Sequence, residues 1–142
     1  MKIACNSEAE TVAVAQRFAA TLKPGDVVAL FGDLGAGKSF FSRAVMRALG
    51  VTDAALPSPT FAIIQEYEAA SCRVAHMDWY RLEDADEIEM LGVRDYFQPP
   101  WVTLIEWPER AKHALPNEVV RVSFRTTGIE SREVEFGNST FD

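Results

Sequence analysis

The sequence predicts one α/β domain with a parallel sheet at its core, flanked by antiparallel strands and by helices. Two runs of mostly β-type apolar residues, 27–31 and 102–105, are typical of strands that are covered on both faces. A helical pattern over residues 38–49 follows the first run after a glycine-rich loop. Because 142 residues have the length of a single domain, we assign residues 1–142 to one unit.

The first half of the chain is predicted to hold two helices around the first strand. Ser7 and Glu10 form a capping-box pattern, and apolar residues then recur at helical spacing, so we expect an amphipathic helix over 8–22. The second helix, 38–49, is followed by Gly50, which suits a left-handed C-cap.

The second half is predicted to be mainly β. Residues 60–67 and 73–78 indicate a hairpin, and an acidic stretch over 83–91 indicates a helix. After the buried strand 102–105, apolar and polar residues alternate around 120–124 and again at 134–136. This alternation predicts two late strands, antiparallel and half exposed.

Composition limits the classes of function. The net charge is −7, with 14 basic against 21 acidic residues, whereas a protein that grips a phosphate backbone by itself normally carries a basic face. If nucleic acid is involved, we expect another subunit to hold it. No apolar run has the length of a membrane span, no signal peptide is recognisable, and the two cysteines are far apart in sequence, so we expect a cytoplasmic protein.

The motif that carries chemistry is the segment Gly32-Asp33-Leu34-Gly35-Ala36-Gly37-Lys38-Ser39, which fits G-x-x-x-x-G-K-[ST] without a mismatch. Such a loop presents its amide groups to one anion, and the helix that begins there adds its positive end. Lys38 is placed to reach the β- and γ-phosphates, and the Ser39 hydroxyl to bind Mg²⁺. We therefore predict a P-loop that binds ATP with Mg²⁺ through these eight residues and the adjoining Phe40.

A P-loop site usually includes an acidic residue at the end of a neighbouring strand, where it helps to hold Mg²⁺. Glu106 follows strand 102–105, and Asp78 ends strand 73–78, so either residue qualifies. Thr60 lies in a loop that suits a γ-phosphate switch or simply begins a strand. Trp107 is either a core residue or an aromatic that stacks on nucleotide or on a partner. His76 and His113 lack the neighbours that a zinc site needs.

Three alternative functions remain open at this point. A small-molecule kinase normally has an arginine-bearing lid, which is not apparent here, and no N-K-x-D motif indicates a GTPase. A nucleotide-sensing module with negligible turnover is the third. It would be favoured if Asp78→Ala or Glu106→Ala protein still bound ATP and kept full function in cells. No arginine identifies itself as a transition-state finger, so outside help in catalysis is plausible.

Five segments in order resemble one family: GDLGAGKS at 32–39, SPTF at 58–61, HMDWYRL at 76–82, LGVRDYF at 91–97 and IEWPER at 105–110. From about Ser7 to Lys112 the chain is similar to the TsaE (YjeE) family, the bacterial ATPase subunits needed to make threonylcarbamoyladenosine in transfer RNA. Ser39 stands where that family often has threonine, Trp79 where leucine is more usual, and Ala62 where a hydroxyl residue is common.

The resemblance implies roles that the residues alone do not. It implies that Glu106 is the metal-associated acid, that Asp78 and Trp107 are needed for turnover, and that Thr60 belongs to a switch-like loop. It also implies that adenine lies near Ser7. The partners would be the TsaB and TsaD proteins, whose complex the ATPase resets between cycles, with tRNA contacted only indirectly and the isolated chain a monomer.

Overall fold

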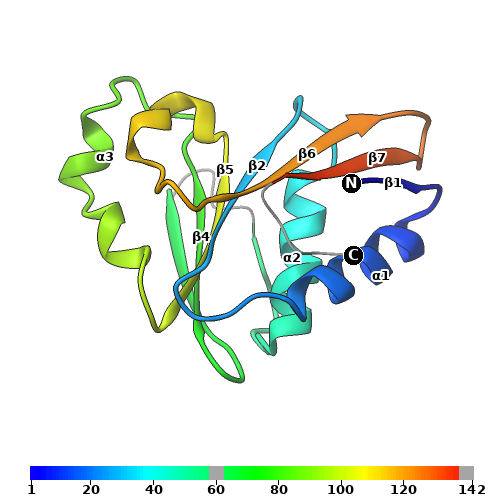
Figure 1. Cartoon of the computed structure of the whole chain (residues 1–142), viewed down its shortest axis with the longest axis horizontal. Coiled ribbons are helices and arrows are strands. Elements are labelled where there is room, and N and C mark those ends of the chain that lie inside the picture. Colours follow the sequence, from blue (N-terminus) through cyan, green and yellow to red (C-terminus); the bar gives the residue numbers. More distant parts are fainter. Residues whose placement is uncertain (58–62, 138–142) are drawn as a thin grey trace.

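The computed structural model describes residues 1–57 and 63–137, which form a seven-stranded sheet in the order β1-β7-β6-β2-β5-β4-β3 (Figure 1). The strands are β1 (Lys2–Cys5), β2 (Val27–Phe31), β3 (Ile64–Glu68), β4 (Arg73–Asp78), β5 (Trp101–Glu106), β6 (Val120–Thr126) and β7 (Arg132–Gly137). The helices are α1 (Glu8–Ala19), α2 (Lys38–Leu49) and α3 (Glu87–Met90), with 3₁₀ segments η1 (Val93–Tyr96) and η2 (Pro108–Ala114).

The predicted parallel core with antiparallel flanks is confirmed. Strand β2 pairs in parallel with both β5 and β6, and β5 pairs in parallel with β4. The outer pairs β3–β4, β6–β7 and β1–β7 are antiparallel. The carboxyl ends of β2, β4, β5 and β6 therefore meet at one edge of the sheet, which is where ligands bind in open α/β sheets.

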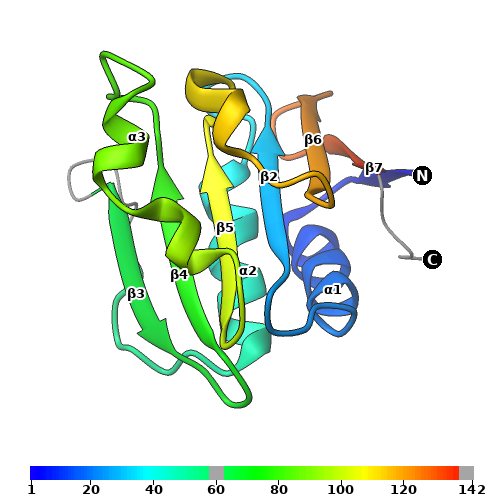
Figure 2. The same ribbon diagram turned by 60° about the vertical axis from the view of Figure 1, so that its left-hand side comes forward.

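Helices cover the central strands on both faces, as the apolar run 27–31 predicted. Val28 and Leu30 pack with α1 and α2 on one face, and Val27 and Ala29 pack with α3, η1 and η2 on the other. Figure 2 shows α2 behind β2 and β5, with α3 on the opposite side. Phenylalanine rings connect the layer of α1 and α2 to strands β6 and β7. The ring centroids of Phe18 in α1 and Phe136 in β7, for example, lie 5.0 Å apart.

The first predicted helix is correct in position but too long. Ser7 caps α1 by accepting a hydrogen bond from the amide of Glu10 at 3.2 Å, as the capping box predicted. The helix ends at Ala19, because Thr21 donates both its amide and its hydroxyl to the carbonyl of Phe18 and tightens the last turn. Gly50 does adopt the left-handed C-cap conformation, with φ of 101°.

The acidic helix predicted over 83–91 is reduced to the four residues of α3. The side chain of Glu87 accepts hydrogen bonds from the backbone amides of Glu83 and Asp84 at 3.2 and 3.1 Å, and Asp84 accepts one from the amide of Asp86 at 2.9 Å. These local contacts hold the acidic stretch in turns rather than in helix.

Among the strands, the hairpin β3–β4 is confirmed, with β3 beginning at Ile64 and residues 58–62 outside the described ranges. The late strands pair antiparallel as predicted, but β6 is also a parallel neighbour of β2 and so belongs to the core. Strand β1 was not predicted. It pairs with β7, and the Met1 amino group donates to the carbonyl of Phe136 at 3.2 Å.

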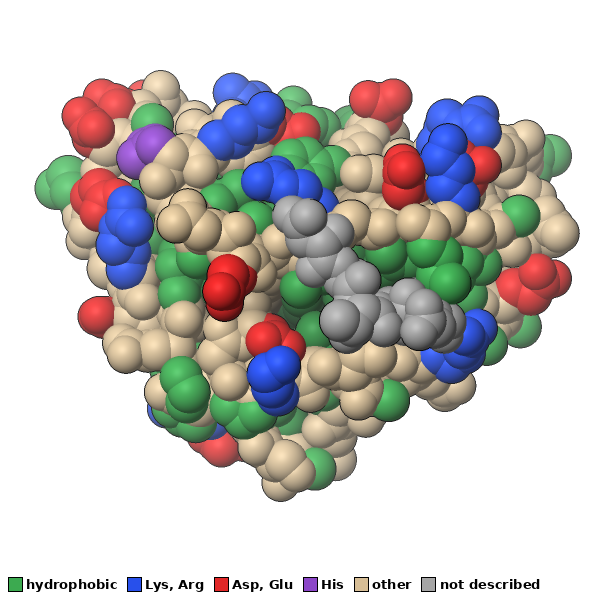
Figure 3. Space-filling model, in the orientation of Figure 1, with side chains coloured by type: hydrophobic (Ala, Val, Ile, Leu, Met, Phe, Trp, Pro, Cys, Tyr) green, Lys and Arg blue, Asp and Glu red, His purple; other side chains and the backbone are tan. Residues whose placement is uncertain are grey.

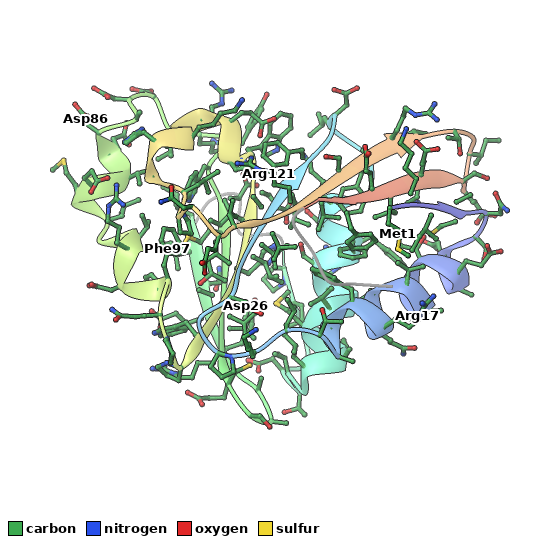
Figure 4. All side chains as sticks on the ribbon, viewed as in Figure 1. Met1, Arg17, Asp26, Asp86, Phe97 and Arg121 are labelled. Atoms are coloured by element: carbon green, nitrogen blue, oxygen red, sulfur yellow. The ribbon has the colours of Figure 1, made fainter. Side chains whose placement is uncertain are left out.

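Among the residues that the structure describes, the face of the molecule in Figure 3 carries no single basic stripe, because basic side chains lie interspersed with acidic ones. This face therefore does not have the basic surface expected of a protein that binds nucleic acid by itself. In Figure 4, Asp86 marks the outer margin of α3, away from the strands. Within the described ranges, every helix is too short or too polar to cross a bilayer.

Candidate nucleotide site

The loop between β2 and α2 folds around the lysine of the motif. Lys38 is buried, with 4% of its surface exposed, and its ammonium donates to the carbonyl oxygen of Gly32 at 2.6 Å. Gly37 caps α2 with φ of 101°, a left-handed conformation that other residues rarely adopt. Helix α2 therefore begins directly after the loop, and the amides of its first turn, which have no partner earlier in the helix, are available to an anion there.

Strand pairing brings the two predicted carboxylates together. Asp78 and Glu106 are the last residues of β4 and β5 and stand directly opposite each other in the register. Leu30 of β2 is the neighbour of Glu106 on its other side, so the acid lies next to the start of the loop. Asp78 is 5% exposed and accepts a hydrogen bond from the amide of Tyr80 at 2.9 Å.

Glu106 is held by hydrogen bonds at both carboxylate oxygens. The Ser39 hydroxyl donates to Oε1 at 2.7 Å, and Nε2 of His76 lies 2.6 Å from Oε2. Burial favours a raised pKa for this acid, but the hydrogen bonds from His76 and Ser39 and the positive charge of Lys38 outweigh burial and lower the pKa of Glu106. The carboxylate is thus kept ionised beside the hydroxyl.

These donors suit magnesium. Mg²⁺ prefers oxygen ligands and is usually bound through one or two carboxylates together with phosphates and water, so the adjacent Ser39 hydroxyl and Glu106 carboxylate fit it. Across residues 1–57 and 63–137, no cluster of three or more His, Cys, Asp or Glu forms a metal cage. A cation here would therefore depend on phosphate oxygens to complete its coordination.

Trp107 covers the ammonium of Lys38. The residue has a left-handed backbone, with φ of 57° and ψ of 49°, and the centroid of its ring lies 3.4 Å from Nζ of Lys38. Tyr80 packs against the same indole at 4.8 Å between ring centroids, and the guanidinium of Arg110 lies over Tyr80. Burial lowers the pKa of Lys38, although Glu109, Glu106 and Asp78 act to raise it.

Arg132 is a residue at this site that sequence reasoning missed. A Cβ atom on Gly37 would overlap its guanidinium group, and the Arg132 guanidinium also lies 5.8 Å from the centroid of the Phe40 ring. Arg132 begins β7, which runs antiparallel to β6, so its position coincides with the carboxyl edge of the parallel strands. No local motif marks it; only the sheet order reveals it.

A cavity of about 300 Å³, here called the phosphate-loop cavity, collects most of the predicted site residues. Its lining is Leu34, Gly35, Gly37, Lys38, Ser39, Phe40, Arg43, Asp78, Glu106 and Trp107. Gly32 and Asp33 contribute carbonyl oxygens inside the loop, and Ala36 is buried beneath it. Thr60 lies outside the described residues.

A second cavity of about 410 Å³ lies between α1 and α2 and shares Phe40 and Arg43 with the phosphate-loop cavity. Its walls include Val12 and Gln16 of α1 and Leu56. Ser7, at the beginning of α1, uses its hydroxyl to cap the helix. The two cavities therefore adjoin each other at Phe40 and Arg43.

Comparison with known proteins agrees with the arrangement. A family model described as "Threonylcarbamoyl adenosine biosynthesis protein TsaE" matches residues 5–134. The tRNA threonylcarbamoyladenosine biosynthesis protein TsaE of Bacillus subtilis is 43% identical over 127 residues, which are 89% of this chain and 78% of that protein. The TsaE protein of Rickettsia typhi is 39% identical over 139 residues, 96% of both chains.

The fold is also similar to a solved structure. The crystal structure of Bacillus subtilis YdiB superposes with a TM-score of 0.81 at 36% sequence identity, covering 96% of this chain and 83% of that one.

Proposed function

This chain belongs to the TsaE family of threonylcarbamoyladenosine biosynthesis proteins, and from that premise we propose that it binds and hydrolyses ATP in the phosphate-loop cavity. One observation carries the proposal. Lys38 and Ser39 of the glycine-rich loop line the same cavity as Asp78 and Glu106, two buried carboxylates at adjacent strand ends. That set of groups matches a triphosphate chelated to a divalent cation.

Each residue has a defined task in the proposed reaction. The loop amides and the ammonium of Lys38 bind the phosphates, and Ser39 and Glu106 hold Mg²⁺. The cation, when bound, supplies positive charge against the phosphate oxygens. Asp78, buried beside Glu106, orients the attacking water or supports the residues that do so. Trp107 and Thr60 are assigned to turnover and to a switch loop.

In this proposal the nucleoside part of ATP lies in the second cavity, next to the phosphate-loop cavity. Phe40 and Arg43 line both cavities, so a ligand anchored on the loop extends past them between α1 and α2. An apolar wall with a few polar groups is typical of small-molecule sites. Ser7 remains a residue near which we predict the adenine to lie.

The hydrolytic step is proposed to serve a larger assembly. In this proposal the chain is a cytoplasmic monomer that joins a complex of TsaB and TsaD proteins and resets it between modification cycles. The net charge of −7 supports an indirect relation to tRNA, because the partners would supply the basic surface.

The test is phosphate release from ATP with Mg²⁺, measured with and without the purified TsaB–TsaD complex. We expect slow release by the chain alone and much faster release with the complex, and Lys38→Ala should abolish nucleotide binding or turnover. Equal rates with and without the partners would contradict the proposed role in the assembly. Calorimetry that detects no heat for adenine nucleotides, on folded protein with Mg²⁺ present, would contradict nucleotide binding itself.

A further inference from the structure

His76 is a buried polar residue that the proposed reaction does not yet use. It lies on β4, two residues before Asp78, and none of its surface is exposed. Side chains alternate along a strand, so His76 and Asp78 point to the same face of the sheet. In the register His76 stands opposite Leu104 and Asp78 opposite Glu106, which makes Glu106 the diagonal neighbour of His76.

The contact between His76 and Glu106 is short and enclosed. Nε2 of the imidazole lies 2.6 Å from Oε2 of the carboxylate, and Glu106 is itself only 3% exposed. Nδ1 of the same ring has no hydrogen-bond partner in the part of the chain that the structure describes. The Nε2 side thus forms the contact that fixes the ring, and in a neutral imidazole it is the side that carries the proton, because a carboxylate only accepts.

The two carboxylate oxygens of Glu106 have different hydrogen-bond partners. Oε2 is taken by His76, and Oε1 faces the Ser39 hydroxyl at 2.7 Å. With one oxygen fixed from behind, the carboxylate cannot rotate freely about its terminal bond, so Oε1 stays on the side of the phosphate-loop cavity. Partners of this kind orient the groups that hold a metal.

We propose that His76 is a positioning residue that holds the Glu106 carboxylate in the orientation required for magnesium, through the Nε2–Oε2 hydrogen bond in the buried layer beneath the cavity. The inference rests on the proposed function, since it assigns to Glu106 a role in holding the cation that accompanies ATP. The proposal also distinguishes His76 from an ordinary core residue. Replacing His76 should change how nucleotide binding depends on Mg²⁺, and not only the affinity for the nucleotide itself.

The experiment measures binding of a non-hydrolysable ATP analogue by calorimetry, once in a chelator and then over a series of Mg²⁺ concentrations. His76→Leu keeps a buried side chain but removes the donor, whereas His76→Gln retains an N–H near the position of Nε2. Val74→Ala is the matched control. Val74 is fully buried on the same face of β4, but it lies two residues before His76 and is therefore further from Glu106.

In His76→Leu we expect the Mg²⁺ concentration that gives half of the maximal gain in affinity for the ATP analogue to rise by about tenfold or more. The affinity for the analogue in the presence of the chelator should be unchanged. His76→Gln should lie close to the wild type, and Val74→Ala should leave the Mg²⁺ dependence unchanged. If His76→Leu does not fold, His76→Asn replaces it, because the shorter amide does not reach Glu106 and should behave as a loss of the donor.

Three results would overturn the inference while leaving the proposed function intact. These are an unchanged Mg²⁺ dependence in His76→Leu, an equal change in Val74→Ala, and a His76→Gln variant as impaired as His76→Leu. A wild-type chain that binds no adenine nucleotide would instead contradict the proposed function, and the inference would fall with it.

Discussion

The ammonium of Lys38 lies 3.4 Å from the centroid of the Trp107 ring while it donates to the carbonyl oxygen of Gly32 at 2.6 Å. The ammonium that is expected to bind phosphate therefore has two partners within the protein, an indole ring and a backbone carbonyl. A triphosphate that takes over Lys38 must compete with both contacts, so part of its binding free energy is spent on separating them.

Trp107→Ala should consequently bind ADP more tightly than the wild type. A cation–π contact contributes about 0.5–2 kcal/mol, which corresponds to about a 2- to 30-fold change in the dissociation constant. Calorimetry with ADP in the absence of divalent cations measures the effect on the phosphate contacts alone.

The matched control is Trp101→Ala, because the Trp101 ring also carries a cation, the guanidinium of Arg73 at 4.4 Å, but lies at the opposite end of β5. That variant should bind ADP as the wild type does. Weaker ADP binding in Trp107→Ala than in Trp101→Ala would mean that the indole contacts the nucleotide rather than competing with it.

The position of many candidate-site residues was predictable because their sequence signals are local. The spacing of the loop from Gly32 to Ser39 is a motif by itself, and the apolar strands that end at Asp78 and Glu106 could be recognised from short runs. The parallel pairing of β2, β4 and β5 then places those residues at one edge, as expected for a sheet of this kind.

What could not be predicted depends on sheet order and on side-chain competition. Arg132 reaches the loop only because β7 pairs with β6 and β6 with β2, a relationship between segments about 100 residues apart in the chain. The role of His76 depends on which strand lies beside β4. The acidic stretch failed as a helix because Glu87 binds the amides of the residues before it.

Gly37→Ala should abolish nucleotide binding and lower the free energy of unfolding. The position has φ of 101°, which costs other residues about 1–2 kcal/mol, and the added Cβ would overlap the Arg132 guanidinium. Both effects displace the loop or the arginine. Denaturant unfolding and ADP calorimetry measure the two consequences separately.

Gly128→Ala provides the comparison, because a Cβ there meets only Ser131, at an ordinary 3.4 Å. We expect ADP affinity to be preserved in that variant. If Gly37→Ala binds ADP as well as Gly128→Ala does, the geometry of the loop does not determine binding.

Arg132→Ala should weaken ADP binding. The guanidinium lies against Gly37 of the loop, so its positive charge is close to the place where we expect a bound phosphate, with which it would form a charge-assisted hydrogen bond. Loss of a charge-assisted hydrogen bond costs about 1.5–3 kcal/mol, or about a 10- to 100-fold weaker affinity.

The control for Arg132→Ala is Arg125→Ala, which removes an exposed arginine paired with Glu133 at 3.3 Å on the same hairpin. Calorimetry should show ADP affinity unchanged for Arg125→Ala. Tighter binding by Arg132→Ala would reverse the assignment and make Arg132 an obstacle that the nucleotide displaces.

Nucleotide binding should take up protons at alkaline pH because of Lys38. Burial holds the pKa of Lys38 below its ordinary value of 10.5 in the free protein, whereas a bound phosphate favours the ammonium form and raises that pKa. At a pH between the pKa of Lys38 in the free protein and its higher pKa in the complex, Lys38 is partly deprotonated in the free protein but protonated in the complex. Affinity must therefore fall as the pH rises through the lowered pKa, with proton uptake on binding.

Calorimetry of ADP binding in two buffers of different ionisation enthalpy detects this uptake. Above about pH 8 the phosphate groups of ADP, whose last pKa is about 6, add no proton of their own. Trp107→Ala should show less uptake, because removing the indole exposes Lys38 and brings its pKa closer to 10.5 in the free protein. Identical heats in the two buffers, together with an affinity that stays constant from neutral to alkaline pH, would show that Lys38 keeps its proton throughout and that its burial does not influence binding.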